Sequence, residues 1–345
     1  MQLEDIKNAE DLRLCMTEPT SGLVNFTEEL DGDLMVLGAG GKMGPDLIET
    51  WRRADRASGT ERTVFAVSRF SDPSGEDVTR LQEVGAQILK GDLTDEDFLR
   101  SLPDVPNLVY MVGFKFGSSD NYRQAWHLNA ILPYLVGRRF PNSRLVAFSS
   151  TNPYPHVPVD SRGCSEDDDL DPKGVYGWGI IARESAFRTT QLSASAQKIL
   201  FFRLAYAQHL GYGVVVDLAR MIQQGEPISL QMPCVNLISQ RDAIDVALRG
   251  LKYAANPAEI LNCSGPIMEV EDIARHLGKH LDREPVFADD PGDEALISTD
   301  KKARNLLGEY RDEPGEIIKA AARWVGSGGE YWGKPTLFGR ADHNY

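Results

Sequence analysis

The sequence predicts an α/β fold built on a doubly wound parallel sheet, with a smaller lid formed by the second half of the chain. Two observations lead to this prediction. Short apolar runs alternate with helical patterns from residue 34 to residue 205, and a glycine-rich turn follows the first of these runs. Alternation of this kind indicates parallel strands that are joined by right-handed helical crossovers.

The glycine-rich turn follows the apolar run Leu34–Leu37, which we expect to be a buried strand. Its three glycines are spaced three residues apart: Gly38, Gly41 and Gly44. The first permits a sharp turn, the second lets the backbone approach a pyrophosphate, and the third allows the strand and the next helix to pack closely. Pro45 suits the first turn of that helix. The turn therefore predicts a Rossmann-type dinucleotide-binding site, and the simpler alternative is an ordinary glycine-rich turn.

The same patterns assign strands, helices and domains along the whole chain. Further strands are expected at 63–67, 86–89, 108–112, 145–148, 199–205 and 260–263. Helices are expected at 42–57, 77–84, 95–101, 119–140, 175–192, 213–223, 241–254 and 270–281. The predicted divisions are an N-terminal extension at 1–32 whose role stays open, with covering a sheet edge as one option, a dinucleotide-binding domain at 33–205, a substrate-binding region at 206–325 with strands returning to the sheet, and a tail at 326–345 packed on the body or on a neighbouring subunit.

Composition excludes several classes of function. The net charge of −14 argues against a nucleic-acid partner, because phosphate binding needs clustered positive charge. No apolar run approaches the roughly 20 residues that span a bilayer, and the acidic N-terminus lacks the pattern of a signal peptide. The four cysteines are far apart and contain no C-x-x-C pair. We therefore expect a cytoplasmic protein with reduced cysteines, no membrane partner and no metal site.

Polar residues follow several of the predicted strands, and in a parallel sheet the carboxyl ends of the strands face one ligand crevice. The end of the second strand usually selects the cofactor, since a carboxylate there binds the ribose 2′-hydroxyl whereas an arginine accommodates a 2′-phosphate. Here that end carries Ser68 and Arg69. This favours NADP, although Arg69 can instead stack on adenine or face solvent, so NAD stays open.

Several motifs resemble those of the extended short-chain dehydrogenase/reductase superfamily, within its NAD-dependent epimerase/dehydratase group. The resemblance runs from about residue 34 to residue 325. GAGGKMG is similar to G-x-x-G-x-x-G, GDL at 91–93 to the adenine-contacting Asp element, and SSTNPYP at 149–155 to S-S-x-x-V-Y-G. YGWGI at 176–180 is similar to Y-x-x-x-K except at its last residue. GFKFG at 113–117, followed by Asn129, resembles the cofactor-contacting loop of UDP-galactose 4-epimerase.

The resemblance implies that Tyr176 exchanges the proton of a substrate hydroxyl, that Ser150 hydrogen-bonds the same oxygen, and that Lys115 lies near the cofactor. Together with the strand ends, it implies these cofactor-binding residues: Gly38, Gly41, Lys42, Met43, Gly44, Ser68, Arg69, Asp92, Leu93, Val112, Gly113, Lys115, Asn129, Ser149 and Tyr176. The group commonly forms dimers through paired helices, so a homodimer is expected.

The family's lysine is missing, because Ile180 stands four residues after Tyr176. A phenol has a pKa near 10, so it needs a nearby cation to ionise usefully at neutral pH. Three interpretations stay open. Lys115 or Arg183 supplies the charge; or another group is the base, from the candidates Glu166, Asp169 and His156; or the protein binds a dinucleotide without turnover, as a sensor.

The substrate is expected to be a carbohydrate-like alcohol, which is a sugar, sugar acid, polyol or glycoside. Counting back from Asp242 places Val235 where nucleotide-sugar members of the group carry a diphosphate-clamping arginine, and the other candidates, Arg220, Arg241 and Lys301, are expected on the surface. Short polar side chains and aromatic faces hold hydroxyl-rich ligands. The candidates are Thr151, Asn152, Tyr154 and Trp178, although aromatic residues in this region can equally be packing residues.

The function predicted from the sequence is therefore that of an NAD(P)-dependent oxidoreductase or epimerase acting on such an alcohol. The alternative is a non-catalytic, dinucleotide-binding regulatory protein of the same fold.

Overall fold

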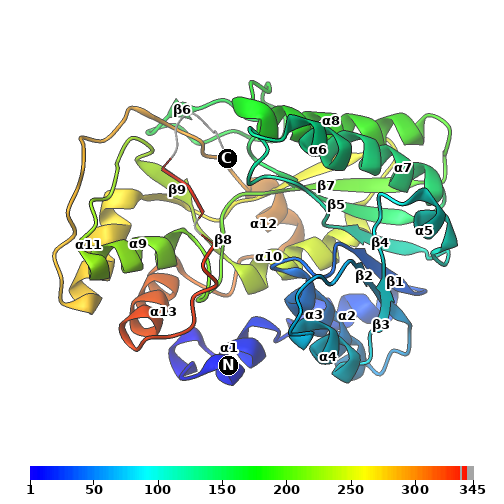
Figure 1. The fold of residues 1–345 in the computed structure, drawn as a ribbon, viewed down its shortest axis with the longest axis horizontal. Helices are drawn as coiled ribbons and strands as arrows, with labels where there is room; N and C mark the ends of the chain where they lie inside the picture. Colours follow the sequence, from blue (N-terminus) through cyan, green and yellow to red (C-terminus); the bar gives the residue numbers. More distant parts are fainter. Residues whose placement is uncertain (335, 340–345) are drawn as a thin grey trace.

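The computed structural model describes residues 1–334 and 336–339. A seven-stranded sheet runs through the molecule in the order β11-β7-β5-β4-β1-β2-β3 (Figure 1). Every neighbouring pair in it is parallel. Its strands are β1 (Leu34–Leu37), β2 (Val64–Ser68), β3 (Gln87–Lys90), β4 (Asn107–Tyr110), β5 (Arg144–Ser150), β7 (Lys198–Leu204) and β11 (Glu259–Cys263). The predicted Rossmann-type α/β fold is confirmed, with each expected sheet strand present.

The strand order reverses at β1. The chain runs outward from β1 to β2 and β3, and then returns to place β4 on the other side of β1. Ligands of open α/β sheets bind beyond the carboxyl ends of the strands at such a switch point. The turn after β1 and the turn after β4 therefore flank the expected crevice.

Helices cover both faces of the sheet, because successive strand residues point to opposite sides. In β1, Leu34 and Val36 join one core with α2, α3 and α10, whereas Met35 and Leu37 join another with α5, α7 and α8. Figure 1 shows these two layers below and above the strands. The helices are α2 (Ser21–Glu29), α3 (Gly44–Ser58), α4 (Glu76–Glu83), α5 (Glu96–Ser101), α6 (Tyr122–Trp126), α7 (Leu132–Arg139), α8 (Gly174–Gln191) and α10 (Gln240–Arg249), followed by the 3-10 turn η3 (Gly250–Tyr253).

The N-terminal extension contains η1 (Leu3–Asp5), α1 (Ala9–Met16) and α2. The sequence leaves its role open, and the option that it covers a sheet edge does not match the structure. Leu23 and Phe26 of α2 are buried in the core beneath α3 and α10, whereas the edges of the sheet are β3 and β11. Two ion pairs lie behind the extension, the buried Arg241 with Asp312 and the partly buried Arg311 with Asp242, and Arg311 also donates to the Glu18 carbonyl of the extension at 2.7 Å.

The long helix expected at 119–140 is broken in its middle. A π-helical turn, η2 (His127–Ile131), separates α6 from α7, and Leu132 donates to the carbonyl of His127. Pro133 accounts for this turn, because a proline ring clashes with the carbonyl four residues earlier, here that of Asn129, and supplies no N–H. Turns of this type often occur at functional sites.

The second half of the chain builds a separate apolar core around α9 (Val214–Gln224), α11 (Val270–Leu281) and α13 (Pro314–Gly326). α12 (Lys301–Leu307) and α13 were not expected from the sequence. Short strand pairs complete this half, and they are β6 (Val157–Pro158) with β13 (Glu294–Ala295), β8 (Ala207–Gln208) with β10 (Ile238–Ser239), and β9 (Cys234–Asn236) with β12 (Ile267–Glu269).

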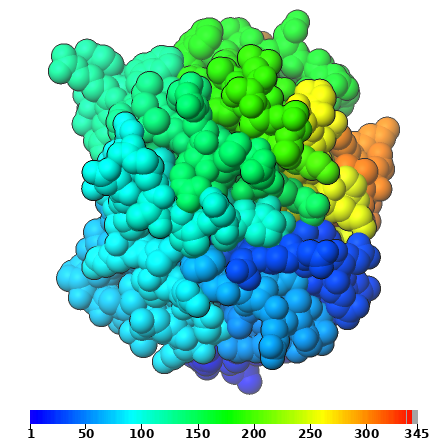
Figure 2. Space-filling model, turned by 90° about the vertical axis from the view of Figure 1, so that its right-hand side faces the viewer, coloured from blue at the N-terminus to red at the C-terminus, as the bar shows by residue number. Residues whose placement is uncertain are grey.

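Figure 2 shows the molecule from the side, where the blue and cyan N-terminal segments form the lower part of the face and green segments the upper part. The predicted tail at 326–345 extends beyond the described residues, since 335 and 340–345 lie outside them. Its described part packs on the body. Within the described residues, none of the helices combines the length and the apolar character needed to cross a bilayer.

Candidate functional site

The glycine loop after β1 is shaped by close backbone contacts. Gly38 has φ +91°, a conformation that favours glycine, and a Cβ there would lie 3.1 Å from the Met111 backbone after β4. A Cβ on Gly44 would lie 2.1 Å from the carbonyl oxygen of Ala39. Gly44 therefore lets α3 begin directly against the strand end, with Pro45 in its first turn. Backbone N–H groups at such a helix start attract anions.

A hollow of about 670 Å³ extends from this loop toward β2 and β3. The structure brings together there the predicted residues Gly38, Gly41, Ser68, Arg69, Asp92, Leu93, Val112 and Gly113. Asp92 accepts hydrogen bonds from the backbone and hydroxyl of Thr94 at 2.9 and 2.8 Å. The backbone bond, above all, lowers the pKa of Asp92.

A second pocket of about 370 Å³ begins at the same glycines and extends toward β5 and α8. It contains the predicted residues Gly38, Gly41, Lys42, Met43, Gly113, Lys115, Ser149, Ser150, Thr151, Asn152 and Tyr176. The two hollows share Gly38, Gly41 and Gly113 as wall residues, so they adjoin at the switch point of the sheet, and we call the two together the channel.

Tyr176 lies on the first turn of α8 and faces Ser150 at the end of β5. Burial raises the pKa of the Tyr176 phenol, and both the charge of Arg183 and a hydrogen bond with Ser150 oppose this rise. The Ser150 hydroxyl also donates to the Asn152 side chain at 2.8 Å. The phenol, the hydroxyl and the amide therefore form one polar group on the pocket wall.

Arg183 is the fixed cation beside this group. Its side chain is 3% exposed and reaches back toward the start of α8, as long helical side chains do. It donates to the carbonyl of Phe148 at 2.7 Å and to the side-chain oxygen of Asn129 at 2.6 Å. The Arg183 backbone lies two helical turns beyond Tyr176, but the side chain is long enough to bring the guanidinium to the pocket wall.

Lys115 also lines the pocket. Its Nζ is 5.6 Å from the ring centroid of Tyr176 and 5.7 Å from that of Tyr206. Burial, and then the charge of Lys42, lower the pKa of Lys115 to about 7. At neutral pH this amine is therefore divided between its charged and neutral forms, which suits a group that exchanges protons.

Asn129 lies behind the pocket wall rather than on it. Its side chain is fully buried, accepts from the backbone N–H of Phe114 at 3.1 Å and donates to the carbonyl of Phe114 at 2.9 Å. Since Asn129 also holds Arg183, it fixes the loop of Lys115 and the guanidinium relative to each other. Direct cofactor contact by Asn129, as expected from the sequence, does not match this placement.

Two predicted substrate residues lie outside the pocket. Tyr154 is 1% exposed, and its hydroxyl donates to Asn262 at 2.9 Å and accepts from Arg203 at 2.8 Å. Trp178 is 53% exposed on the outer side of α8. The expectation that these residues bind substrate is therefore wrong. Trp178 comes two residues after Tyr176 in α8 and so lies on another side of the helix, and Tyr154 is buried in the core.

The alternative bases of the acidic loop also lie elsewhere. Glu166 accepts from the backbone N–H of Asn262 at 2.8 Å, and His156 contacts the amine of Lys173 at 3.1 Å. Among the described residues that line the pocket, neither these two nor Asp169 occurs. Arg241, expected on the surface, is buried against Asp312 instead.

Sequence reasoning missed part of the pocket. Tyr206, Gln208, Tyr212 and Thr336 line it, from β8, its flanking turns and the C-terminal segment. Tyr206 and Gln208 follow β7, so the strand-end rule that found Ser150 extends to them. No sequence pattern around Thr336 indicates that it lines the pocket, because it belongs to a segment distant in sequence from the other lining residues.

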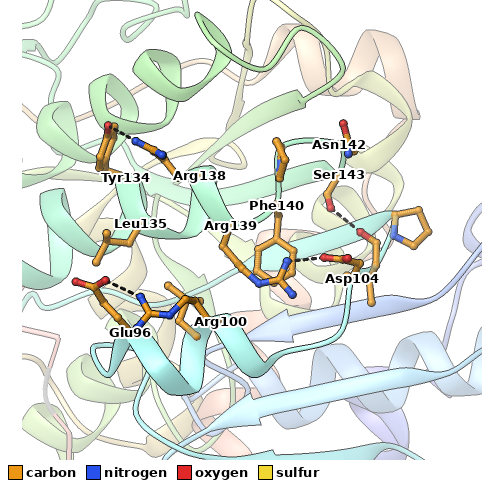
Figure 3. Close-up of a pocket in the computed structure, with 14 residues that line it drawn as sticks. Glu96, Arg100, Asp104, Tyr134, Leu135, Arg138, Arg139, Phe140, Asn142 and Ser143 are labelled. Carbon is orange, nitrogen blue, oxygen red and sulfur yellow. Dashed lines mark hydrogen bonds and ion pairs between the residues drawn. The ribbon is translucent and has the colours of Figure 1, made fainter.

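A further hollow of about 940 Å³ lies at the amino ends of β4 and β5, at the end of the strands opposite the channel (Figure 3). Its charged groups satisfy one another: Arg100 pairs with Glu96, and Arg139 pairs with Asp104. Ligands of this class of sheet bind at the carboxyl ends, so this hollow is not the candidate site.

The sheet order and the glycine loop define a Rossmann-type fold, with the channel at the carboxyl ends of its strands. Comparison with solved structures specifies the fold further. A UDP-glucuronic acid 4-epimerase from Bacillus cereus, in complex with UDP-4-deoxy-4-fluoro-glucuronic acid and NAD, matches with TM-score 0.70 and 14% identity over 86% of this chain and 99% of that chain. A UDP-glucose 4-epimerase from Thermotoga maritima matches with TM-score 0.69 and 16% identity, over 86% and 99%.

A UDP-Glc/GlcNAc 4-epimerase from Campylobacter jejuni matches with TM-score 0.68 and 19% identity, over 86% of this chain and 100% of that chain. Neither a family model nor a curated protein sequence matches the chain. The chain therefore has the fold of the sugar-nucleotide 4-epimerases, as the motif resemblance implied.

Proposed function

We propose that this protein is an NAD(P)-dependent oxidoreductase or epimerase that acts on a small carbohydrate-like alcohol. The observation that carries the proposal is the convergence of the glycine loop, Ser150 and Tyr176 on one channel at the carboxyl ends of the strands. Solved proteins of the same fold are described in complexes with NAD and with UDP-sugars. A sensor that only binds dinucleotide needs no Ser150–Tyr176 pair.

The residues of the channel fit a dinucleotide. Gly41 leaves the loop open beside the start of α3, where backbone N–H groups face a pyrophosphate. Asp92 and Leu93 suit contacts with adenine, and Lys115 and Ser149 suit the nicotinamide end. Arg69, beside Ser68, supports NADP, since a guanidinium pairs bidentately with phosphate. When bound, the nicotinamide ring accepts or returns a hydride at the substrate carbon.

The protein's own residues then handle the proton of the substrate hydroxyl. Tyr176 takes this proton on oxidation and gives it back on reduction, while Ser150 hydrogen-bonds the same oxygen and stabilises its developing charge. Arg183 replaces the missing lysine as the permanent cation that favours the phenolate. Lys115, which titrates near neutrality, passes protons between this pair and solvent.

We propose a substrate without a diphosphate. Two of the arginines that could clamp one are engaged elsewhere: Arg241 pairs with Asp312, and Arg220 lies 4.2 Å from the ring centroid of Tyr331. The pocket beyond the glycine loop offers short polar groups instead, from Thr151, Asn152 and Gln208. These groups suit the hydroxyls of a free sugar, sugar acid, polyol or glycoside.

We also propose a homodimer. Large apolar side chains are exposed on α6, η2, α7 and α8, which contact one another. Contiguous exposed apolar patches mark interaction sites, and we propose that these side chains form one. Its members are Tyr122, Trp126, Ile131, Tyr134 and Trp178.

The test is a panel of sugars and polyols with NAD or NADP, followed by reduced-nicotinamide absorbance and by stereochemical analysis of the recovered substrate. Tyr176→Phe should lower turnover by about 10²–10⁴-fold and leave dinucleotide affinity within about twofold of the wild-type value. Tyr253→Phe is the control, because that hydroxyl bonds the Leu306 carbonyl outside the channel. Turnover that survives in Tyr176→Phe would contradict the assigned base.

A further inference from the structure

The described C-terminal residues 330–334 and 336–339, here called the strap, return from α13 to the channel. The indole of Trp332 stacks on His209, with ring centroids 4.4 Å apart and planes at 28°. Its backbone N–H donates to the Gly211 carbonyl at 3.0 Å. Both contacts are to the turn that follows β8, and the Tyr212 ring on this turn lines the pocket.

Asp217 of α9 binds the strap at two residues, Tyr331 and Thr336. Its carboxylate accepts from the backbone N–H and the hydroxyl of Thr336, each at 2.7 Å, and from the hydroxyl of Tyr331 at 3.3 Å. Phe338 is buried in the second core. These contacts hold the strap in one position on the body.

Residues of the strap line three neighbouring hollows. Thr336 lines the pocket of Tyr176 and Ser150. Lys334 lines the hollow of Ser68 and Arg69, and it also lines an adjoining hollow of about 700 Å³ that contains Gly40, Gly41 and Lys42. A residue near the end of the chain is thus placed beside the glycine loop.

Lys334 adds a positive charge to hollows that hold charges of both signs: Lys42 and Arg69 line one each, and Asp72 lines both. Lys42 packs its Nζ 3.5 Å from the ring centroid of Tyr212, and Arg69 lies in the other hollow that Lys334 lines. Burial first, and then the charge of Lys334, lower the pKa of Lys42 to about 8. Neighbouring like charges repel one another, so a phosphate between Lys42 and Lys334 would relieve this repulsion, in competition with the carboxylate of Asp72.

We propose that the strap is part of the dinucleotide site and that Lys334 contacts a phosphate of the bound dinucleotide. This inference rests on the proposed function. The phosphate is either the pyrophosphate beside Gly41 or the 2′-phosphate beside Arg69, since Lys334 borders both places. The strap then forms part of the wall around the bound dinucleotide.

The experiment measures the dissociation constants of NADP and NAD by calorimetry for the full-length wild type, Lys334→Gln and Lys334→Arg. Lys279→Gln is the matched control, because it removes the same charge from the exposed side of α11. We expect Lys334→Gln to weaken binding about tenfold, as for loss of one charge-assisted hydrogen bond, and Lys334→Arg to restore most of it.

The arms separate the two phosphates. A loss confined to NADP assigns Lys334 to the 2′-phosphate, and an equal loss for NADP and NAD assigns it to the pyrophosphate. Affinities of Lys334→Gln within twofold of wild type for both dinucleotides would overturn this inference alone. A wild type that binds neither dinucleotide would overturn the proposed function and this inference together.

A second variant tests the strap independently of Lys334. Asp217→Asn keeps the shape of the anchor but weakens its three hydrogen bonds to the strap. We expect faster dissociation of the dinucleotide in stopped-flow measurements, because this part of the wall is less firmly held. An unchanged dissociation rate in this variant would contradict a strap that forms part of the wall around the bound molecule.

Discussion

Arg183 donates a hydrogen bond of 2.6 Å to the side-chain oxygen of Asn129, across the gap between α8 and the π-helical turn. The same amide also holds the backbone of Phe114. This relationship joins three segments of the channel and places a permanent positive charge beside Tyr176. The motif resemblance puts Ile180 where the epimerase/dehydratase group has a lysine, and in the proposed function Arg183 supplies the cation instead.

Replacing Arg183 by Met should therefore change the pH dependence of turnover. Loss of the cation raises the pKa of Tyr176, so the rising limb of the pH–rate profile should move to higher pH and the rate at pH 7 should fall at least about tenfold. The unfolding free energy should also fall by about 1–3 kcal/mol, because buried acceptors lose their partner. Arg183→Lys should recover part of the shift; a loss of stability with an unmoved profile would indicate a purely structural residue.

Lys115→Met should stabilise the free protein while it impairs turnover. The pKa of Lys115 is about 7 in the folded state and near 10.5 in the unfolded chain. Below pH 7 both states hold the proton, and the folded state bears the full cost of burying the charge. Between pH 7 and pH 10.5 this cost falls, because only the unfolded chain stays protonated.

The melting temperature of Lys115→Met should therefore exceed that of wild type most at pH 6, with a difference that shrinks toward pH 10. Differential scanning fluorimetry across this range measures it, with Lys279→Met as the exposed-lysine control. A difference that is constant with pH would show that Lys115 is not held with a lowered pKa.

Tyr154→Phe should cost stability and leave catalysis alone. The hydroxyl joins Asn262 to Arg203 in the core, so its removal leaves buried polar atoms with one partner fewer. We expect urea unfolding to show a loss of about 1–3 kcal/mol, with kcat/KM within twofold of wild type. A raised KM at unchanged stability would contradict this prediction and support substrate binding by Tyr154.

Ile131→Arg should dissociate the proposed dimer. Ile131 is 51% exposed within the apolar group on α6, η2, α7 and α8. Light scattering should give twice the 38.2 kDa chain mass for wild type and the single mass for the variant. Val286→Arg is the control, because Val286 is equally exposed in the other half of the molecule. A monomeric wild type would contradict the proposal.

The sequence indicated the sheet and its glycine loop because these depend on local patterns. Apolar runs of four to seven residues and glycines at fixed spacing are constrained by backbone geometry alone. Strand-end residues such as Ser68 and Ser150 followed from the parallel topology, which needs no knowledge of side-chain packing.

The remaining parts of the site depend on contacts between distant segments. The reach of Arg183 toward Tyr176 is set by side-chain direction and by Asn129, fifty-four residues earlier. Tyr154 was wrongly predicted to bind substrate, because Arg203 and Asn262 hold its hydroxyl in the core. Lys334 and Thr336 enter the channel only because Asp217 and His209 hold the strap, and no local pattern records such a contact.

The most direct test of the dinucleotide site is calorimetric titration of NADP and NAD into wild type and Gly41→Ala. A methyl group at Gly41 would lie 3.3 Å from the Gly38 carbonyl, which small shifts accommodate, but it would face the approaching phosphates. Gly315→Ala is the control, because nothing lies near its Cβ position. The account predicts binding to wild type and to the control, at least about tenfold weaker binding to Gly41→Ala, and similar melting temperatures for all three free proteins. Absence of binding to wild type, or equal affinities of wild type and Gly41→Ala, would contradict it.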